Sequence, residues 1–332
     1  MEDLFELNII VPLVPVYVPE NHLSEYIDSA IKDILTLNGK IEINIENIGR
    51  FSLNVFSFTD EPFIEKAFPN TGDVVLVFRI VIPNTSNEIE ISTTDDKIIT
   101  PEERLSLFKH SIVHEFKFQV INLLVLSNIA RPGGIKTRDG IVSLNRERFE
   151  SFPSIYSIHR ESLDDIKALK WPVYKSLDLL SVWQWIERNN FSFQSHSKTK
   201  VDRALNAFTY LFKDSPENMV FDLFWSLIGV EALYCSSKDG ISEQIYEKVQ
   251  LVLGPVTESK KKVKSMYNFR SRLVHGDIDI PPNHFDYWDT DEEKFQDELF
   301  DATILAVAIL TATLQEIVFK NETSLNFKYI LE

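Results

Sequence analysis

The feature that most constrains the fold is a change in the spacing of apolar residues about half-way along this chain of 332 residues. "KIEINIENI" (40–48) and "NEIEIST" (87–93) alternate apolar and polar residues, and "DVVLVFRIVIP" (73–83) is a continuous apolar run rich in β-branched residues. Alternation predicts strands with one solvated face, and the continuous run predicts a central strand. From Trp171 onward, these strand patterns nearly vanish. The sequence therefore predicts an α+β domain followed by an all-α bundle.

Helical patterns complete this organisation. "NHLSEYIDSAIKDIL" (21–35) carries an apolar stripe, and residues 101–130 begin with Pro and two Glu, which favour a helix start, and run to the loop "RPGGIKTRDG" (131–140). Five or six further helices are expected after residue 171, with Gly254 and Gly276 in positions typical of helix ends. We predict an α+β domain of unknown role over residues 1–150 and a helical domain over 160–332.

Composition favours a soluble, cytoplasmic protein with no membrane segment. The single cysteine, Cys235, cannot form an internal disulfide, which favours a reducing compartment. The acidic N-terminus does not resemble a signal peptide. The apolar stretch 302–319 meets Gln315 and Glu316 before it reaches the ~20 apolar residues of a membrane span, so it predicts a buried helix.

Charge is distributed unevenly. The chain has a net charge of −16, and its first hundred residues hold 17 acidic against 6 basic residues, which makes that part an improbable RNA surface. Residues 258–276 reverse this balance, with six cations and one carboxylate. Four of these cations are lysines: Lys260, Lys261, Lys262 and Lys264. They are candidates for binding RNA phosphates, although the lysine run taken alone is better explained as an ordinary solvated helix face.

Arg270 and His275 lie within the same basic segment, in "YNFRSRLVHGD" (267–277). An arginine can hold a phosphate through its planar fork, and a histidine can accept or give a proton near neutral pH. Five residues span about 140° around a helix, so the two side chains do not share one face of a straight helix. We expect His275 in a frayed last turn before a left-handed Gly276, with its ring free to turn toward Arg270.

The surroundings of this pair resemble the Apea-like branch of the HEPN superfamily. Members of that branch carry an "ALEALL"-type helix and later a "Y-x-x-R-S-x-(aliphatic)-V-H-G" segment. Residues 228–233 ("IGVEAL") stand for the first, with Gly229 where alanine is usual. The second is matched by Tyr267, Arg270, Ser271, Val274, His275 and Gly276. The resemblance covers about residues 170–320.

The resemblance implies a helical bundle that forms a homodimer and joins two Arg-x4-6-His motifs into one ribonuclease cleft. Many members are toxins or anti-phage effectors, and some cleave tRNA. Arg270 and His275 would be the catalytic pair of a metal-independent endoribonuclease, without a cofactor or metal. Ser271 would fill the polar position after the arginine, and Glu231 would orient Arg270 or Arg272. The remaining supporting residues are Tyr267, Arg272 and Asp277.

Two alternatives remain open on the sequence. The bundle could be a non-catalytic module that dimerises and binds RNA or a partner, because binding and cleavage use the same groups. Arg270 and His275 could also be purely structural, capping a helix and pairing with Glu231 or Asp277. In the catalytic hypothesis, the α+β domain would sense an unknown trigger or select the RNA.

Other signals are weaker. His110 and His114 lie one helical turn apart, as metal ligands can, but no third ligand is near in sequence, and ordinary helix histidines are the better interpretation. "RPGGIKTRDG" lacks the ending of a phosphate-binding loop and predicts a turn, although contact with RNA phosphates is an alternative. Tyr174, Trp183 and Trp185 predict core or interface aromatics. His284 follows the motif and could reach the same cleft.

Overall fold

The structure is a computed structural model that describes most of the chain. The described residues are 4–14, 21–57, 74–86, 99–157, 159, 163–191, 193, 195–213, 219–237, 239–256, 260–280 and 290–327. They form two compact units, Met1–Ser127 with Gly134–Ile155, and Asn128–Gly133 with Tyr156–Glu332. The first combines a sheet with helices and the second is helical, which confirms the predicted change of class along the chain.

A five-stranded antiparallel sheet with strand order β4-β5-β1-β6-β7 forms the first unit. Its strands are β1 (Leu4–Pro12), β4 (Asn54–Ser57), β5 (Val75–Pro83), β6 (Gly140–Leu144) and β7 (Glu147–Phe152). The continuous apolar run at 73–83 becomes β5, which pairs with a neighbour on each side as predicted. The segment predicted as a strand at 87–93 lies outside the described residues.

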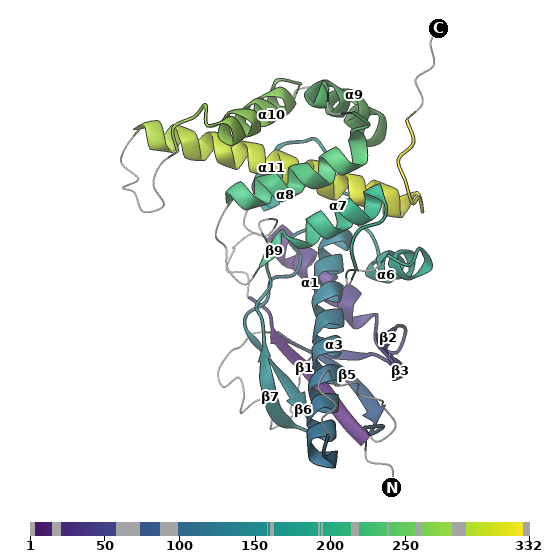
Figure 1. Cartoon of the computed structure of the whole chain (residues 1–332). Coiled ribbons are helices and arrows are strands. Elements are labelled where there is room, and N and C mark those ends of the chain that lie inside the picture. The colour runs from purple at the N-terminus through teal and green to yellow at the C-terminus, as the bar shows by residue number, and fades with distance from the viewer. Residues whose placement is uncertain are drawn as a thin grey trace. The chain divides into compact units, whose positions relative to one another are not determined.

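Two helices and a small hairpin accompany the sheet. The predicted helices are confirmed as α1 (Asn21–Leu35) and α3 (Pro101–Ala130), and the alternating segment at 40–48 pairs as β2 (Glu42–Ile45) with β3 (Gly49–Ser52). Helix α3 runs along one face of the sheet (Figure 1). The rings of Phe5 on β1 and Phe108 on α3 lie 5.8 Å apart between centroids.

The sequence analysis did not predict the hairpin that β6 and β7 form. Asn145 and Arg146 make its turn, and both have positive φ, 52° and 68°. Two successive left-handed residues give the primed turn that matches the twist of antiparallel strands. Asparagine tolerates this conformation, but arginine carries no such signal, which explains why the turn was missed.

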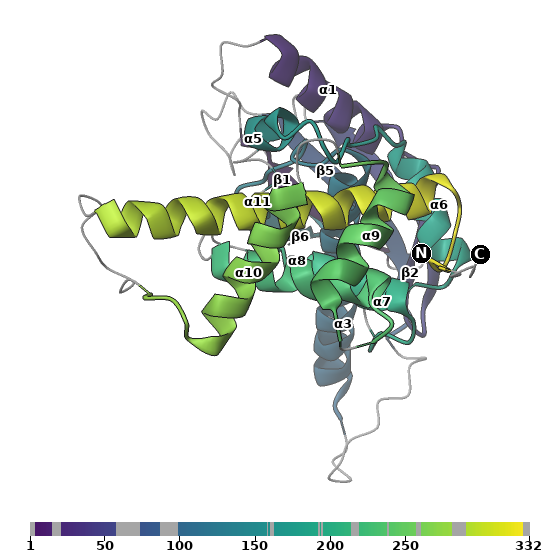
Figure 2. The same cartoon turned by 90° about the horizontal axis from the view of Figure 1, so that it is seen from above.

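Helices dominate the second unit. They are α5 (Leu163–Ala168), α6 (Leu179–Arg188), α7 (Lys200–Thr209), α8 (Met219–Tyr234), α9 (Ile241–Leu253), α10 (Lys260–His275) and α11 (Thr290–Phe319). Figures 1 and 2 show α8, α9 and α10 packed around α11. The unit is not purely α-helical, because β8 (Tyr156–Ser157) pairs with β9 (Phe212–Lys213). A ladder of two residues per strand is too short to leave an apolar pattern in the sequence.

Helix α11 is the core helix of this unit. By length and composition, its segment Glu293–Phe319 could cross a membrane, but most of its apolar window is buried inside the fold. Residues 302–315 are all buried, as predicted for this stretch. Gly229 on α8 lets the two helices approach closely, because a Cβ there would lie 2.7 Å from Leu310 Cδ1.

Candidate functional site

Helix α10 carries the predicted motif. Its inner side buries Val263, Met266, Tyr267 and Phe269, which anchor the helix in the unit. The helix stays regular through His275, so the last turn is not frayed as the sequence analysis expected. It ends in a left-handed Gly276 (φ 74°), as predicted. The Asp277 N–H donates to the Arg272 carbonyl at 2.8 Å, the bond of a Schellman cap.

Arg270 faces α8. Its Nη2 lies 3.6 Å from Glu231 Oε1, and the two side chains are 30% and 23% exposed. Arg270 Nε and Glu231 Oε1 are buried atoms that lack a hydrogen-bond partner within the described part of the chain. Of the two arginines weighed for Glu231, the structure therefore pairs it with Arg270, through a long contact that leaves hydrogen-bonding capacity unused on both sides.

Tyr267 lies one helical turn before Arg270, and its hydroxyl is a third buried group without a partner among the described residues. Burial raises the pKa of Tyr267 well above 10, and the charge of Glu231 raises it further. Burial also raises the pKa of Glu231, while the Arg270 charge opposes that shift. The tyrosine thus stays a neutral hydrogen-bond donor in this cluster.

His275 is exposed at the end of α10. Because α10 is regular up to this residue, His275 and Arg270 point about 140° apart around the helix axis. Arg270 lies against α8, and His275 faces solvent. A single chain therefore does not direct both groups at one point.

The other predicted residues lie around α10. Ser271 and Asp277 are exposed, and Arg272 pairs with Glu298 on α11. Lys261, Lys262 and Lys264 are exposed, so their charges face solvent. The side chain of Lys260 lies outside the described residues.

The structure also places the other residues and segments that the sequence analysis singled out. His110 and His114 are exposed on α3, and the described residues contain no group of three side chains that could hold a metal ion. Trp183 and Trp185 are buried on α6, as predicted for core aromatics. The segment 131–140 forms the predicted turn between α3 and β6. His284 lies outside the described residues.

A row of apolar residues on α8 continues from Glu231. Phe221 and Ile228 are 53% and 39% exposed. Between them Trp225 stacks on Tyr210, with ring centroids 3.8 Å apart and planes at 8°. These α8 positions are spaced by three or four residues, so they share one helix face with Glu231. This exposed face cannot be recognised from the sequence, because α8 is apolar on nearly every side.

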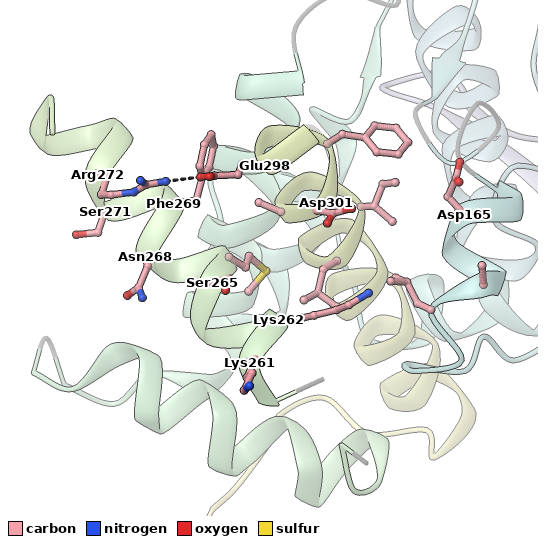
Figure 3. A pocket seen from close by; sticks show the side chains of 17 residues that line it. Asp165, Lys261, Lys262, Ser265, Asn268, Phe269, Ser271, Arg272, Glu298 and Asp301 are labelled. Atoms are coloured by element: carbon pink, nitrogen blue, oxygen red, sulfur yellow. Dashed lines mark hydrogen bonds and ion pairs between the residues drawn. The ribbon is translucent and has the colours of Figure 1, made fainter. Parts of the chain in front are cut away.

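The sequence analysis also missed a cavity of about 870 Å³ between α5, α10 and α11 (Figure 3). From α10 it is lined by Lys261, Lys262, Ser265, Asn268, Phe269 and Arg272, among others. Most of these positions lie on one face of the helix, so their spacing in the sequence could have indicated this face. The spacing could not show which helices lie opposite it.

Comparison with known proteins found no matching family model, no matching curated protein and no matching solved structure. The assignment of function consequently depends on the local chemistry of α8 and α10. That chemistry comprises a half-exposed guanidinium with unused hydrogen bonds, a neighbouring carboxylate, a buried neutral hydroxyl and an exposed histidine.

Proposed function

We propose that this chain is a metal-independent endoribonuclease of the HEPN type. The observation that carries the proposal is the incompletely paired Arg270: its charge reaches the surface, while its Nε and the facing Glu231 Oε1 lack hydrogen-bond partners within the described residues. A buried polar group without a partner is costly and calls for an explanation, and a catalytic role is one such explanation. A phosphate oxygen is the acceptor that a guanidinium binds most strongly.

The cleavage reaction needs a positively charged group that stabilises the phosphate and a group that transfers a proton. In transphosphorylation, the ribose 2′-oxygen loses its proton and bonds to the adjacent phosphorus, and the bond from phosphorus to the 5′-oxygen of the next nucleotide breaks. His275 would accept the 2′-hydroxyl proton or protonate the departing 5′-oxygen. Arg270 would stabilise the negative charge that builds up on the phosphate oxygens. The products are a 2′,3′-cyclic phosphate and a free 5′-hydroxyl.

The divergence of Arg270 and His275 around α10 favours a composite site. Two copies related by a two-fold axis would supply two arginines and two histidines to one cleft, so that the groups facing an RNA need not come from one chain. The exposed apolar residues of α8, Phe221 and Ile228, lie on the face that carries Glu231. Burying this face in a homodimer would bring the two Arg270 side chains close to the two-fold axis.

The proposed substrate and biological setting rest on the resemblance of residues 170–320 to the Apea-like branch. The exposed lysines at 261, 262 and 264, with Lys260, would hold the RNA backbone through charge. The substrate is an RNA such as tRNA, and the setting is cytoplasmic anti-phage defence or toxin action. The first unit would sense the trigger or select the RNA.

A second candidate is a non-catalytic HEPN module that dimerises and binds RNA or a partner. The Arg270–Glu231 pair favours it, since a carboxylate that holds the guanidinium against α8 also stabilises the contact between the helices. In this case Arg270 would bind phosphate, and His275 would not transfer a proton.

Incubation of the purified protein with tRNA and mRNA in EDTA tests the proposal. Cleavage should persist, and sequencing of the cut ends should show 2′,3′-cyclic phosphates or 3′-phosphates. Loss of all activity on chelation, with 5′-phosphate ends, would contradict the mechanism. Tight RNA binding without cleavage would favour the second candidate.

A further inference from the structure

The ion pair between Arg270 and Glu231 would compete with an RNA phosphate for the same guanidinium. The pair is long, with 3.6 Å between Arg270 Nη2 and Glu231 Oε1, and no other cation pairs with Glu231 within the described part of the chain. A phosphate is also an anion, and it can accept two parallel N–H bonds from one guanidinium. Binding of RNA would therefore loosen the ion pair and take the counter-charge from Glu231.

Glu231 is poorly placed to lose this partner. Its side chain is 23% exposed, and its Oε1 is a buried atom without a hydrogen bond from the described residues. Burial raises its pKa, and the Arg270 charge is what opposes that shift. A partly buried carboxylate that loses its cation without gaining a donor is costly. The release of Arg270 thus needs a second group that donates a hydrogen bond to Glu231.

Tyr267 offers such a donor. It lies three residues before Arg270, so the two side chains share the face of α10 that packs toward α8. The tyrosine is 6% exposed, and its hydroxyl is a buried atom that has no partner among the described residues. The charge of Glu231 contributes to the raised pKa of this hydroxyl, which indicates that the two side chains are near one another. The hydroxyl is therefore an unused neutral donor beside the carboxylate.

We propose that Tyr267 is a positioning residue for RNA: when an RNA phosphate draws Arg270 away from Glu231, the Tyr267 hydroxyl donates a hydrogen bond to the released carboxylate. The inference rests on the proposed function in one respect, that Arg270 binds an RNA phosphate, and it holds whether or not the RNA is then cleaved. In the free protein the unpaired hydroxyl lowers stability, and RNA binding recovers that loss. Tyr267 acts through Glu231 and Arg270, without touching the RNA.

Tyr267→Phe tests this exchange, because it removes the hydroxyl and keeps the ring. The full chain is titrated with a 2′-O-methylated RNA oligonucleotide, in which the methyl group blocks the attacking oxygen and prevents cleavage. Tyr267→Phe should weaken binding by about tenfold, the effect of one lost hydrogen bond to a charged group. It should melt at the same temperature as the wild type or higher, since the free protein loses no hydrogen bond.

A second buried tyrosine provides the matched control. Tyr234 on α8 is 1% exposed, but its hydroxyl lies 2.7 Å from Thr313 Oγ1. Tyr234→Phe should therefore lower the melting temperature and leave the RNA affinity unchanged, the reverse of the pattern expected for Tyr267→Phe.

A double-mutant cycle tests whether Tyr267 acts through Glu231. A glutamine at position 231 carries no charge and needs no compensating donor when Arg270 leaves it. Tyr267→Phe added to Glu231→Gln should therefore change the RNA affinity by less than about threefold, in place of the tenfold loss expected in the wild-type background.

Three results would overturn the proposal. The first is an RNA affinity that falls in Arg270→Ala but stays unchanged in Tyr267→Phe. The second is a tenfold loss that persists when Glu231→Gln is present. The third is a lower melting temperature for Tyr267→Phe, which would show that its hydroxyl already has a partner in the free protein. Binding of the oligonucleotide without cleavage of natural RNA would refute the ribonuclease proposal alone, whereas a wild type that binds no RNA would refute both.

Discussion

Arg270 is the residue on which the account of the site depends. A guanidinium with five N–H donors rarely leaves a buried nitrogen unpaired, because an unmatched buried donor costs about 1–3 kcal/mol. Here the Nε is buried without a partner within the described residues, and the contact with Glu231 is long, at 3.6 Å. If RNA supplies the missing acceptor, the cost is recovered on binding. If nothing does, Arg270 is a structural residue.

Substitutions at Arg270 separate these cases. Arg270→Ala should lower RNA cleavage about a hundredfold or more and weaken RNA binding, since it removes a charge-assisted fork. Arg270→Lys should restore binding better than cleavage, because the charge survives but the two-pronged geometry does not. Glu231→Gln is the control for the structural role. Equal losses of melting temperature in Arg270→Ala and Glu231→Gln, with RNA effects that only follow unfolding, would contradict a functional Arg270.

His159 is the residue that should make stability depend on pH. It is fully buried, its Nε2 lies 2.7 Å from Thr311 Oγ1, and burial lowers its pKa from 6.5 to about 3. The unfolded chain therefore binds one more proton than the folded chain between about pH 6.5 and pH 3. Its contribution to stability is complete above pH 6.5 and is lost as the pH falls, at roughly 1.4 kcal/mol per pH unit within this window.

Urea unfolding at pH 7.5 and pH 5.0 tests this prediction. The free energy of unfolding should fall by about 1–2 kcal/mol between the two pH values. His159→Gln should show a smaller difference, even though it lowers stability at both pH values by disturbing a packed site. An equal pH difference in both proteins would show that His159 is not the group responsible.

At the scale of elements, the contact between α8 and α11 positions Glu231. Gly229 lies two residues before Glu231, and the space for its missing Cβ is filled by Leu310 of α11. Both helices would have to move apart, or Leu310 would have to change rotamer, to accommodate a larger residue.

Gly229→Ala should therefore destabilise the protein, although alanine is the better helix former. Alanine gains about 1 kcal/mol in helix propensity, whereas overpacking a core typically costs about 1–3 kcal/mol. We expect a lower melting temperature, and the added substitution Leu310→Ala should make Gly229→Ala neutral or stabilising. A higher melting temperature for Gly229→Ala alone would show that α8 and α11 are less closely packed than the structure indicates.

The elements also show what the sequence could and could not predict. Periodicity predicted α1, α3, β5 and the buried α11, because each buries a long, regular stripe or run. It missed the β6–β7 hairpin, whose turn contains Arg146 at positive φ, and the short β8–β9 ladder. Within the site, the sequence correctly predicted the left-handed Gly276 at the end of α10. The expectation that a frayed last turn would let His275 turn toward Arg270 was wrong, because α10 stays helical through His275. The ion pair of Arg270 with Glu231 and the α5 wall of the cavity depend on tertiary contacts between helices. The residue pattern of one helix does not predict such contacts.

At the scale of the whole molecule, the central inference is that two copies form the working unit. One chain presents Arg270 and His275 on different sides of α10, and it exposes Phe221 and Ile228 on α8. Exposed apolar residues on one helix face are typical of interaction surfaces.

Substitutions on α8 test this assembly. Sedimentation of the wild-type chain at micromolar concentrations should show a dimer, and Ile228→Arg should produce monomers, because it places a charge in an apolar interface. Leu251→Arg on α9 is the matched control, since Leu251 is 75% exposed and lies on another helix. A wild-type monomer, or a dimer that Ile228→Arg leaves intact, would contradict a dimer through α8.

The most direct measurement compares RNA cleavage by the wild type and His275→Ala in EDTA, beside a melting curve for each. His275 is exposed, so its removal should leave the melting temperature unchanged. A proton carrier typically supplies about 10²–10⁴-fold in rate and little binding, so cleavage should fall by that factor while RNA affinity persists. A His275→Ala protein that melts like the wild type and cuts RNA equally fast would contradict the catalytic account.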